Sequence, residues 1–259
     1  GDGATPRELA INLGQRPVRV DLWGHAAPLL NSDHTTGGKV LLSVGTMPIF
    51  LVDIDGRQAQ LRASVSIDQP LMESSFHPHE RRVRFTNFYD RAIAGTLHLH
   101  GPDGWTINPP TFSFTLNPGE TFDRAFTMQF PYNCVAGKKT LRCEFVLANE
   151  KNATFAVPLI MKLGLTDVGM QTIALRDGRD IVVQQVVTNY GDHPINYAAF
   201  ATYSGQARQE RVVTDLAPGA TTIRRYRFHN IPHTPNGAAR VGLKELQGTR
   251  ILNDLVEVE

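Results

Sequence analysis

The stretch Phe-Thr-Asn-Phe-Tyr-Asp at residues 85–90 returns in altered form as Val-Thr-Asn-Tyr-Gly-Asp at residues 187–192. A second stretch, Leu-Asn-Pro-Gly at residues 116–119, is matched by Leu-Ala-Pro-Gly at residues 216–219. The two central asparagines lie 102 residues apart, and the two prolines lie 100 residues apart. A period of about 100 residues is too long for a solenoid unit and is the size of one β-sandwich domain. The repeat therefore predicts two copies of one module.

Apolar and polar residues alternate with a period of two through most of the chain, for example at residues 61–67, 112–116 and 141–147. Such alternation is typical of half-buried strands, and turn signals such as Gly-Pro-Asp-Gly at residues 101–104 separate them. Residues 168–258 divide into about seven strands, the number found in an immunoglobulin-like sandwich. We therefore predict an all-β fold with two immunoglobulin-like β-sandwiches in tandem and an N-terminal antiparallel β segment.

The first part of the chain does not fit the repeat. Residues 9–13 and 18–22 are expected to form a hairpin, and residues 39–44 and 47–52 to form two further strands. Four strands are too few to close a sandwich, so this segment is expected to be the tail of a larger β-sandwich. The predicted domains are an N-terminal β segment at 1–57, a first sandwich at 58–163 and a second sandwich at 164–259. The junction at 162–166 is short and has no Pro or Ser, which favours packed rather than loosely tethered sandwiches.

Charge and hydropathy narrow the range of partners. The 259 residues include 26 Lys and Arg against 25 Asp and Glu, a formal net charge of +1. The basic residues are scattered, which argues against a nucleic-acid surface. The longest nearly unbroken apolar run, residues 44–52, is far shorter than the roughly 20 residues that span a bilayer. We therefore expect no nucleic-acid partner and no membrane insertion.

The two cysteines, Cys134 and Cys143, flank a predicted turn at residues 136–138. A pair on either side of a turn can come within bridging distance and form a disulfide. The alternative is two free thiols, with Cys143 facing the core beside Leu141 and Phe145. The sequence leaves both alternatives open.

Acidic residues are plentiful, but they fall singly on turns, where solvated acids belong. They are Asp53, Asp55, Asp90, Asp103, Glu120 and Asp192. Glycoside hydrolysis needs two carboxylates at a defined separation. The sequence also lacks the nucleophile elbow, the phosphate-binding loop and the dinucleotide-binding loop. We therefore predict that the chain is not an enzyme, with no catalytic residues and no cofactor.

Two His-x-His patterns, at residues 77–79 and 98–100, are the sharpest candidates for metal ligation. His98 and His100 share one face of a predicted strand. Two imidazoles make only half of a zinc site, and the pattern supplies no third ligand. We therefore predict no metal site.

A series of short motifs runs through the first module in order. They are Phe-Thr-Asn at 85–87, Gly-Pro-Asp-Gly-Trp at 101–105, Leu-Asn-Pro-Gly-Glu at 116–120, Pro131, and Gly-Lys at 137–138. This series resembles the NPCBM-associated NEW3 family, an immunoglobulin-like domain of bacterial exported glycosidases and surface proteins. The resemblance covers residues 60–160. The second module keeps the Thr-Asn and Leu-Ala-Pro-Gly motifs but lacks the Gly-Trp.

Two stretches of the N-terminal segment, Asp-Leu-Trp-Gly-His at 21–25 and Met-Pro-Ile-Phe-Leu at 47–51, form a second resemblance. They are similar to the closing strands of the β-sandwich that follows the catalytic barrel in several retaining glycosidase families. The catalytic acids of such enzymes lie in the barrel, and no barrel precedes this segment in the present sequence. The resemblance implies a partner, the missing catalytic domain of the parent chain. It makes Trp23 and Phe50 the candidates to line a docking surface.

The resemblances together imply a non-catalytic accessory or spacer region of an exported bacterial glycosidase-like protein, which docks or stabilises a catalytic domain. Two alternatives stay open, a carbohydrate-binding module that contacts a polysaccharide and a cell-surface adhesion module.

Sugar binding calls for exposed aromatic rings beside polar groups. Phe88 and Tyr89, in the loop after a strand, and their repeat counterpart Tyr190 are the candidate ligand-binding residues. Tyr132 is a further aromatic candidate, whereas Trp105 is expected to pack at the edge of the sandwich core.

Overall fold

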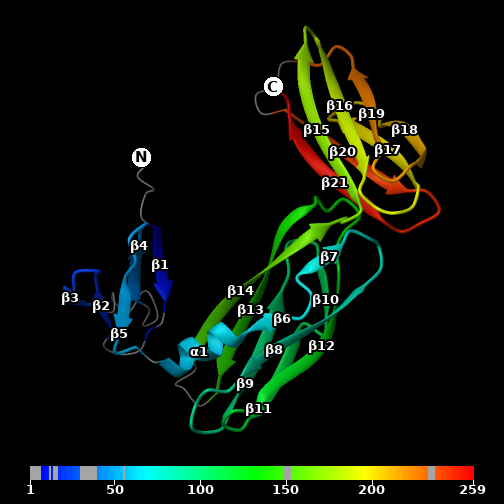
Figure 1. Cartoon of the computed structure of the whole chain (residues 1–259). Coiled ribbons are helices and arrows are strands. Elements are labelled where there is room, and N and C mark those ends of the chain that lie inside the picture. The colour runs from blue at the N-terminus through cyan, green and yellow to red at the C-terminus, as the bar shows by residue number, and fades with distance from the viewer. Residues whose placement is uncertain are drawn as a thin grey trace.

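The computed structural model describes residues 7–11, 13, 17–29, 40–54, 56–148, 153–232 and 237–259. Across these residues the fold is built from strands, with one short helix, α1 (Gly56–Ser64). Figure 1 shows the strands in three groups that follow the chain: a small N-terminal β segment and two sandwiches that meet end to end. The prediction of an all-β fold is confirmed.

The first sandwich consists of a four-stranded and a five-stranded sheet. The smaller sheet contains β6 (Ser66–Ile67), β8 (His79–Thr86), β10 (Thr106–Asn108) and β12 (Thr121–Gln129), in the order β10-β12-β8-β6. The larger sheet contains β7 (Leu71–Glu73), β9 (Ile93–His100), β11 (Thr111–Leu116), β13 (Gly137–Leu147) and β14 (Ala153–Gly164), in the order β11-β9-β13-β14-β7. Strands β7 and β14 pair in parallel, and the other neighbours pair antiparallel.

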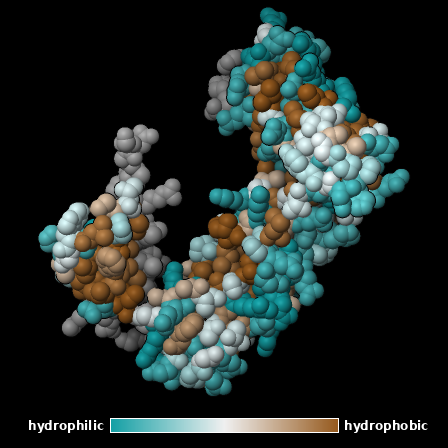
Figure 2. All heavy atoms as spheres, in the orientation of Figure 1, coloured by the Kyte–Doolittle hydropathy of each residue, from teal (hydrophilic) through white to brown (hydrophobic). Residues whose placement is uncertain are grey.

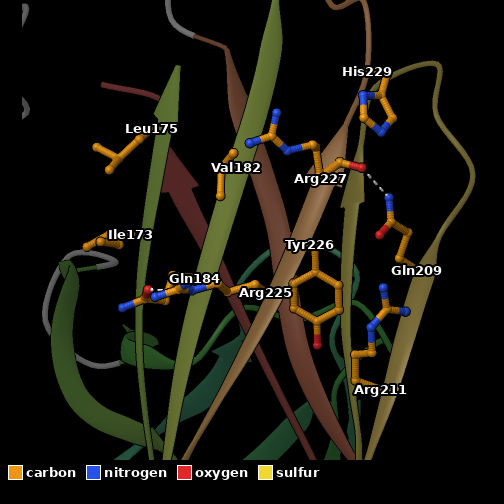
Figure 3. Close-up of a pocket in the computed structure, with 10 residues that line it drawn as sticks. All are labelled: Ile173, Leu175, Val182, Gln184, Gln209, Arg211, Arg225, Tyr226, Arg227 and His229. Atoms are coloured by element: carbon orange, nitrogen blue, oxygen red, sulfur yellow. Dashed lines mark hydrogen bonds between the residues drawn. The ribbon is translucent and has the colours of Figure 1, made fainter. Parts of the chain in front are cut away.

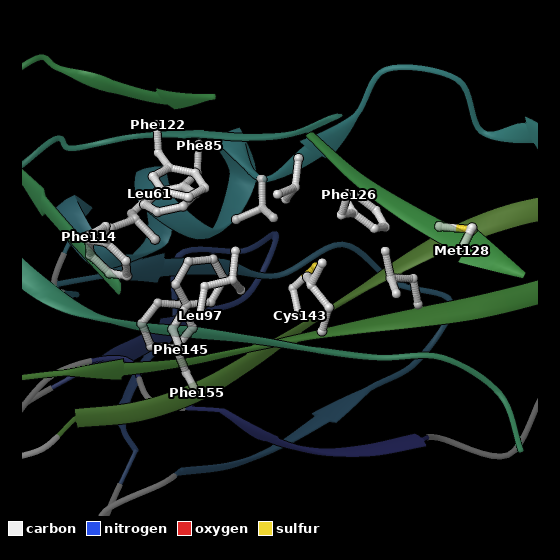
Figure 4. Packing of buried hydrophobic residues seen from close by; sticks show 14 of the residues in the cluster. Leu61, Phe85, Leu97, Phe114, Phe122, Phe126, Met128, Cys143, Phe145 and Phe155 are labelled. Carbon is white, nitrogen blue, oxygen red and sulfur yellow. The ribbon is translucent and has the colours of Figure 1, made fainter. Parts of the chain in front are cut away.

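Aromatic rings fill the space between these two sheets (Figure 4). Phe85 on β8 lies among them, with its ring centroid 4.8 Å from that of Phe122 and 5.0 Å from that of Phe145. Phe122 lies on β12, in the same sheet as Phe85, whereas Phe145 lies on β13, so the contact with Phe145 joins one sheet to the other. Burying a side chain of this size stabilises a fold by roughly 1.5–3 kcal/mol. The alternation of apolar and polar residues therefore places the aromatic side chains of both sheets in one shared core.

The prediction of a strand at residues 61–67 is wrong for most of its length, because residues 56–64 form α1. The buried helix residues are Gln58 and Leu61, three positions apart and hence on one helical face. Leu61 and Val65 also satisfy a spacing of four as well as a spacing of two, so alternation alone misassigns the segment. The Gln, Arg, Leu and Ala residues of this stretch favour a helix. Only β6, at residues 66–67, remains a strand.

The second sandwich has seven described strands. One sheet contains β15 (Val168–Asp177), β16 (Asp180–Asn189) and β19 (Thr221–Phe228), in the order β15-β16-β19. The other contains β17 (Ile195–Tyr203), β18 (Gln209–Leu216), β20 (Ala238–Glu245) and β21 (Ile251–Glu257), in the order β18-β17-β20-β21. A polar bridge crosses the core: Tyr226 Oη donates to Gln185 Oε1 at 3.0 Å, and Gln185 Nε2 donates to the Gly242 carbonyl at 3.1 Å.

A buried asparagine side chain closes the end of β8. Asn87 Nδ2 donates to the carbonyl oxygens of Arg91 at 2.9 Å and Leu116 at 3.0 Å. Its Oδ1 accepts the backbone N–H of Tyr89 at 2.9 Å. We call this arrangement the Asn87 clasp. It satisfies three backbone groups with one fully buried side chain.

The end of β16 carries the same arrangement, the Asn189 clasp. Asn189 Nδ2 donates to the carbonyl oxygens of His193 and Leu216, both at 2.8 Å, and Oδ1 accepts the N–H of Gly191 at 2.9 Å. The backbone repeats as well, since Gly119 N–H donates to Asn87 O and Gly219 N–H to Asn189 O, both at 2.9 Å. The sequence repeat thus corresponds to a repeated set of hydrogen bonds.

The two sandwiches are joined by main-chain hydrogen bonds. The Phe76 N–H donates to the Thr249 carbonyl at 3.1 Å, and the Ile251 N–H donates to the Ser74 carbonyl at 2.8 Å. Arg250 adds an ion pair across the junction, to Glu73 at 3.8 Å, and is held from its own sandwich by Asp167 and Glu245, both at 2.7 Å. Packed sandwiches, as the short junction predicts, are what the structure contains.

In the N-terminal segment, β1 (Arg7–Ile11) pairs with β4 (Val40–Val44). Strand β2 (Val18–Val20) pairs with β3 (Ala26–Pro28) and with β5 (Phe50–Val52). The predicted hairpin of residues 9–13 and 18–22 is therefore wrong, because both strands choose partners further along the chain. Register depends on which apolar faces pack together, and local turn signals do not report that.

Candidate functional site

The three predicted ligand-binding aromatics lie at the clasps, in different environments. Phe88 is 42% exposed and Tyr190 is 65% exposed, but Tyr89 is only 5% exposed. The Asn87 clasp holds the Tyr89 N–H, and the Tyr89 side chain belongs to the aromatic core. Tyr89 therefore cannot present its ring to a ligand.

Phe88 and Tyr190 do not form a joint site. The loop of Phe88 is tied to α1 by an ion pair of Asp90 with Arg57 at 2.8 Å. Tyr190 lies beside the junction instead, where its N–H donates to the Asp167 carbonyl at 2.7 Å. Each is a single exposed ring, and its role in binding stays a prediction.

The candidate docking residues are the most exposed large apolar side chains of the N-terminal segment, with Trp23 at 71% and Phe50 at 56%. Leu22, Met47 and Val52 are exposed as well. Figure 2 shows apolar side chains gathered on this segment. The structure thus places both candidates at the surface, and their docking role stays a prediction.

Both cysteines are free thiols, which decides between the two alternatives. No turn separates them in the way that a bridge requires, because β13 runs straight from Gly137 through Cys143. Those six steps of extended chain cover roughly 20 Å. Cys134 precedes Gly137 by three residues, which span at most about 11 Å, so its Cα cannot come within the roughly 7 Å of Cys143 that a bridge needs. Cys143 is buried in the core, and burial raises the pKa of its thiol to about 12.

The His-x-His pairs have local partners. His98 Nδ1 lies 3.1 Å from the Thr111 hydroxyl, and His100 Nε2 lies 3.5 Å from a Glu144 carboxylate oxygen. His79 stacks on Phe130, with 5.6 Å between the ring centroids. Burial, and then the charge of Arg81, lower the pKa of His79. Among the described residues, no three His, Cys, Asp or Glu side chains come close enough to hold a metal ion.

Among the residues that the structure describes, the carboxyl groups with a shifted pKa are all shifted downward. Hydrogen bonds from Arg82 and Arg84 lower that of Asp123, and the Asn230 N–H and Arg227 lower that of Asp180. A general acid in glycoside hydrolysis needs a raised pKa. These carboxylates act as anchors for arginine side chains.

In the part of the chain that the structure describes, no helix is long and apolar enough to cross a bilayer.

A groove of about 570 Å³ lies on the second sandwich (Figure 3). Ile173 and Leu175 project from β15, and Arg225 and Arg227 project from β19, with β16 between these two strands. The arginines already have partners, because Arg227 pairs with Asp177 at 2.7 Å and Arg225 Nε donates to Gln184 at 3.1 Å. The tyrosine ring of this groove, Tyr226, is buried. The groove therefore offers aliphatic and cationic surface, and the ring that opens onto it is the imidazole of His229 rather than a tyrosine.

A second groove, of about 510 Å³, lies where the two sandwiches meet. We call it the junction groove. It is lined by Tyr132 of the first sandwich and by residues of the second, namely Ala198, Arg208, Glu210, Lys244, Glu245, Leu246, Gln247 and Gly248. The Tyr132 ring is 44% exposed and stacks on Phe76, with 5.0 Å between centroids and 8° between planes. Sequence reasoning named Tyr132 but not this groove, because its polar walls come from the other sandwich.

Residues 80–146 match the family model described as NPCBM-associated, NEW3 domain of alpha-galactosidase. The match lies within the first sandwich, from β8 to β13, and confirms the NEW3 resemblance seen in the sequence motifs. No curated protein matches the chain.

Among solved structures, the chain is similar to red sea bream transglutaminase at 11% identity and a TM-score of 0.31, over 92% of this chain and 40% of that one. It is also similar to the secreted serine protease VesC from Vibrio cholerae at 8% identity and a TM-score of 0.35, over 88% of this chain and 58% of that one. The YadV chaperone gives 11% identity and a TM-score of 0.29, over 74% of this chain and 99% of that one. At such low scores these similarities carry no argument about function.

Proposed function

We propose that this chain is a non-catalytic accessory region of an exported bacterial glycosidase-like protein, and that its N-terminal segment docks a catalytic domain of the same parent protein. The family match supports the general class, since it names a domain of alpha-galactosidase. The two joined sandwiches would then act as a spacer of fixed geometry.

The observation that carries the docking proposal is the apolar face of the sheet β3-β2-β5. Directly paired residues of antiparallel strands point to the same side. Val20 pairs with Phe50 and Val18 pairs with Val52, so these four side chains share one face. Phe50 and Val52 on that face are exposed, and Trp23 projects from the turn beside β2. Val18 and Val20 are half-buried, so the open part of this apolar face is formed by Phe50 and Val52. An exposed apolar patch of this kind is expected to be covered by a partner.

The junction supports the spacer role. Short linkers without secondary contacts let domains tumble independently, whereas a ladder of main-chain bonds fixes their angle. Here residues 74–76 pair with residues 249–251, and Arg250 is held by acids from both sides of the junction. Force or orientation imposed at one sandwich would therefore reach the other.

Co-purification with the catalytic domain of the parent gene product tests the docking proposal. We expect that domain to co-elute with the wild-type chain and to elute separately from a Trp23→Ser/Phe50→Ser variant. A Phe88→Ser/Tyr190→Ser variant removes two exposed rings elsewhere and is expected to co-elute normally. A parent gene that encodes no glycosidase domain, or co-elution that survives the Trp23/Phe50 change, would contradict the proposal.

A further inference from the structure

We infer that the junction groove is a binding site for a neutral saccharide unit of a polysaccharide, with Tyr132 as the stacking platform. This inference comes from the geometry of the groove and does not rest on the docking proposal. A sugar ring presents C–H groups on its faces and hydroxyls at its rim. A site for it therefore needs one open aromatic face with donors and acceptors around it.

The Tyr132 ring is held in place by Phe76, and the loop that carries it is held by Asn253. Phe76 covers one face of the Tyr132 ring, and the residue keeps 44% of its surface exposed where it lines the groove. Asn253 Nδ2 donates to the Tyr132 carbonyl at 3.0 Å and to the Cys134 carbonyl at 3.3 Å, and the Ala136 N–H donates to the Asn253 carbonyl at 2.8 Å. Because Asn253 lies on β21, the second sandwich fixes the loop that carries the platform. Preorganisation of this kind lowers the entropic cost of binding.

The polar wall of the groove is equally ordered. Arg208 lies over the Phe200 ring, 3.8 Å from its centroid, and pairs with Glu210 at 2.5 Å. Glu245 is held by Arg250 through contacts of 2.9 Å and 2.7 Å. Ala198, a buried residue with a small side chain, also lines the groove.

The chemistry of the wall selects the ligand class. Arg208, Lys244 and Gln247 supply donors, while Glu210 and Glu245 supply acceptors. Each sugar hydroxyl both donates and accepts, so a mixed wall suits it. Two cationic and two anionic side chains leave the groove without net charge, which favours a neutral sugar over a uronate or a phosphate.

The junction groove is large enough to hold a sugar unit, whereas the exposed rings of Phe88 and Tyr190 line no such groove. About 510 Å³ is within the usual range of roughly 300–1,000 Å³ for small-molecule sites. Phe88 and Tyr190 are exposed rings, but neither lines this groove or the groove in Figure 3.

Affinity electrophoresis of the full chain tests the inference, with gels that contain galactomannan, xyloglucan, mixed-linkage β-glucan, arabinogalactan or dextran. We expect at least one of them to retard the wild-type chain. Tyr132→Ala should weaken binding by about tenfold, because it removes the stacking face, and Tyr132→Trp should retain it. Ala198→Trp places a large ring in the lining of the groove and should abolish retardation.

Trp23→Ala and Phe50→Ala each remove an exposed ring of the N-terminal segment, outside the groove; they serve as matched controls and should leave retardation unchanged. A thermal melt of each variant establishes that it is folded. Retardation by none of the five glycans would overturn the inference, as would retardation that survives both Tyr132→Ala and Ala198→Trp. Retardation by polygalacturonate alone would overturn the assignment to neutral sugars. None of these failures would affect co-elution with a catalytic domain, so they are distinguishable from failure of the docking proposal.

Discussion

Replacing Asn87 by Ala is expected to destabilise the first sandwich by about 3–5 kcal/mol. The Asn87 clasp supplies three hydrogen bonds, to Arg91 O, Leu116 O and Tyr89 N, at 2.9–3.0 Å. The truncation leaves three backbone groups without these partners in a site where Asn87 itself is fully buried. Each unsatisfied buried group costs about 1–3 kcal/mol, and water entry and relaxation keep the total below the simple sum.

The matched perturbation is Asn189→Ala in the second sandwich, because the Asn189 clasp makes the same three bonds. If the repeat is structural, the two losses should agree within about 2 kcal/mol. Thr188→Val, which removes only the exposed hydroxyl contact to Thr221, is expected to cost less than about 1 kcal/mol.

The assay is urea unfolding with two local probes. Trp105 packs against the core of the first sandwich, and in a Trp23→Phe background it is the single tryptophan of the chain. Its fluorescence then follows the first sandwich alone, while hydrogen exchange of β16 and β19 follows the second. A loss below about 1 kcal/mol for Asn87→Ala, or a clear loss for only one of the two asparagines, would refute the reasoning.

Three further predictions concern other parts of the chain. Iodoacetamide is expected to label Cys134 but not Cys143 in the folded protein, because Cys143 is buried and its pKa is raised to about 12; two labels or none on the native chain, by mass spectrometry, would contradict this. Burial lowers the pKa of His79 in the folded state, so the unfolded state binds more protons and stability falls as pH drops through about 6.5. His79→Phe should flatten the change in urea midpoint between pH 7.5 and 5.5, and an equal slope in both proteins would count against this. Arg250→Ala should separate the calorimetric melting of the two sandwiches, because it removes the ion pair with Glu73 across the junction and the side chain that Asp167 and Glu245 hold there. A single unchanged transition would be the opposite result.

The repeat and the alternating pattern were enough to predict two sandwiches, because a period of two with one apolar face has few other folded solutions. They did not predict α1, since Leu61 and Val65 fit a helix and a strand equally well. They also did not predict the pairing of β1 with β4, which depends on contacts between distant segments.

The candidate sites show the same division. Exposure of Trp23, Phe50, Phe88 and Tyr190 agrees with their positions in turns and at the edges of short strands. Tyr89 is buried instead, because the Asn87 side chain accepts a hydrogen bond from its backbone N–H and holds the loop with the ring in the core. The junction groove could not be predicted from the sequence, because Tyr132 and its polar neighbours come together only when the two sandwiches pack.

Hydrogen–deuterium exchange in the intact parent protein tests the central claim most directly. If the apolar face of β3-β2-β5 docks a catalytic domain, amides of residues 18–28 and 50–52 should exchange more slowly in the parent protein than in the isolated chain. Exchange in β16 and β19, which lie in the second sandwich, should be equal in both and serves as the internal reference. Equal exchange at residues 18–28 and 50–52 in the two proteins would contradict the account.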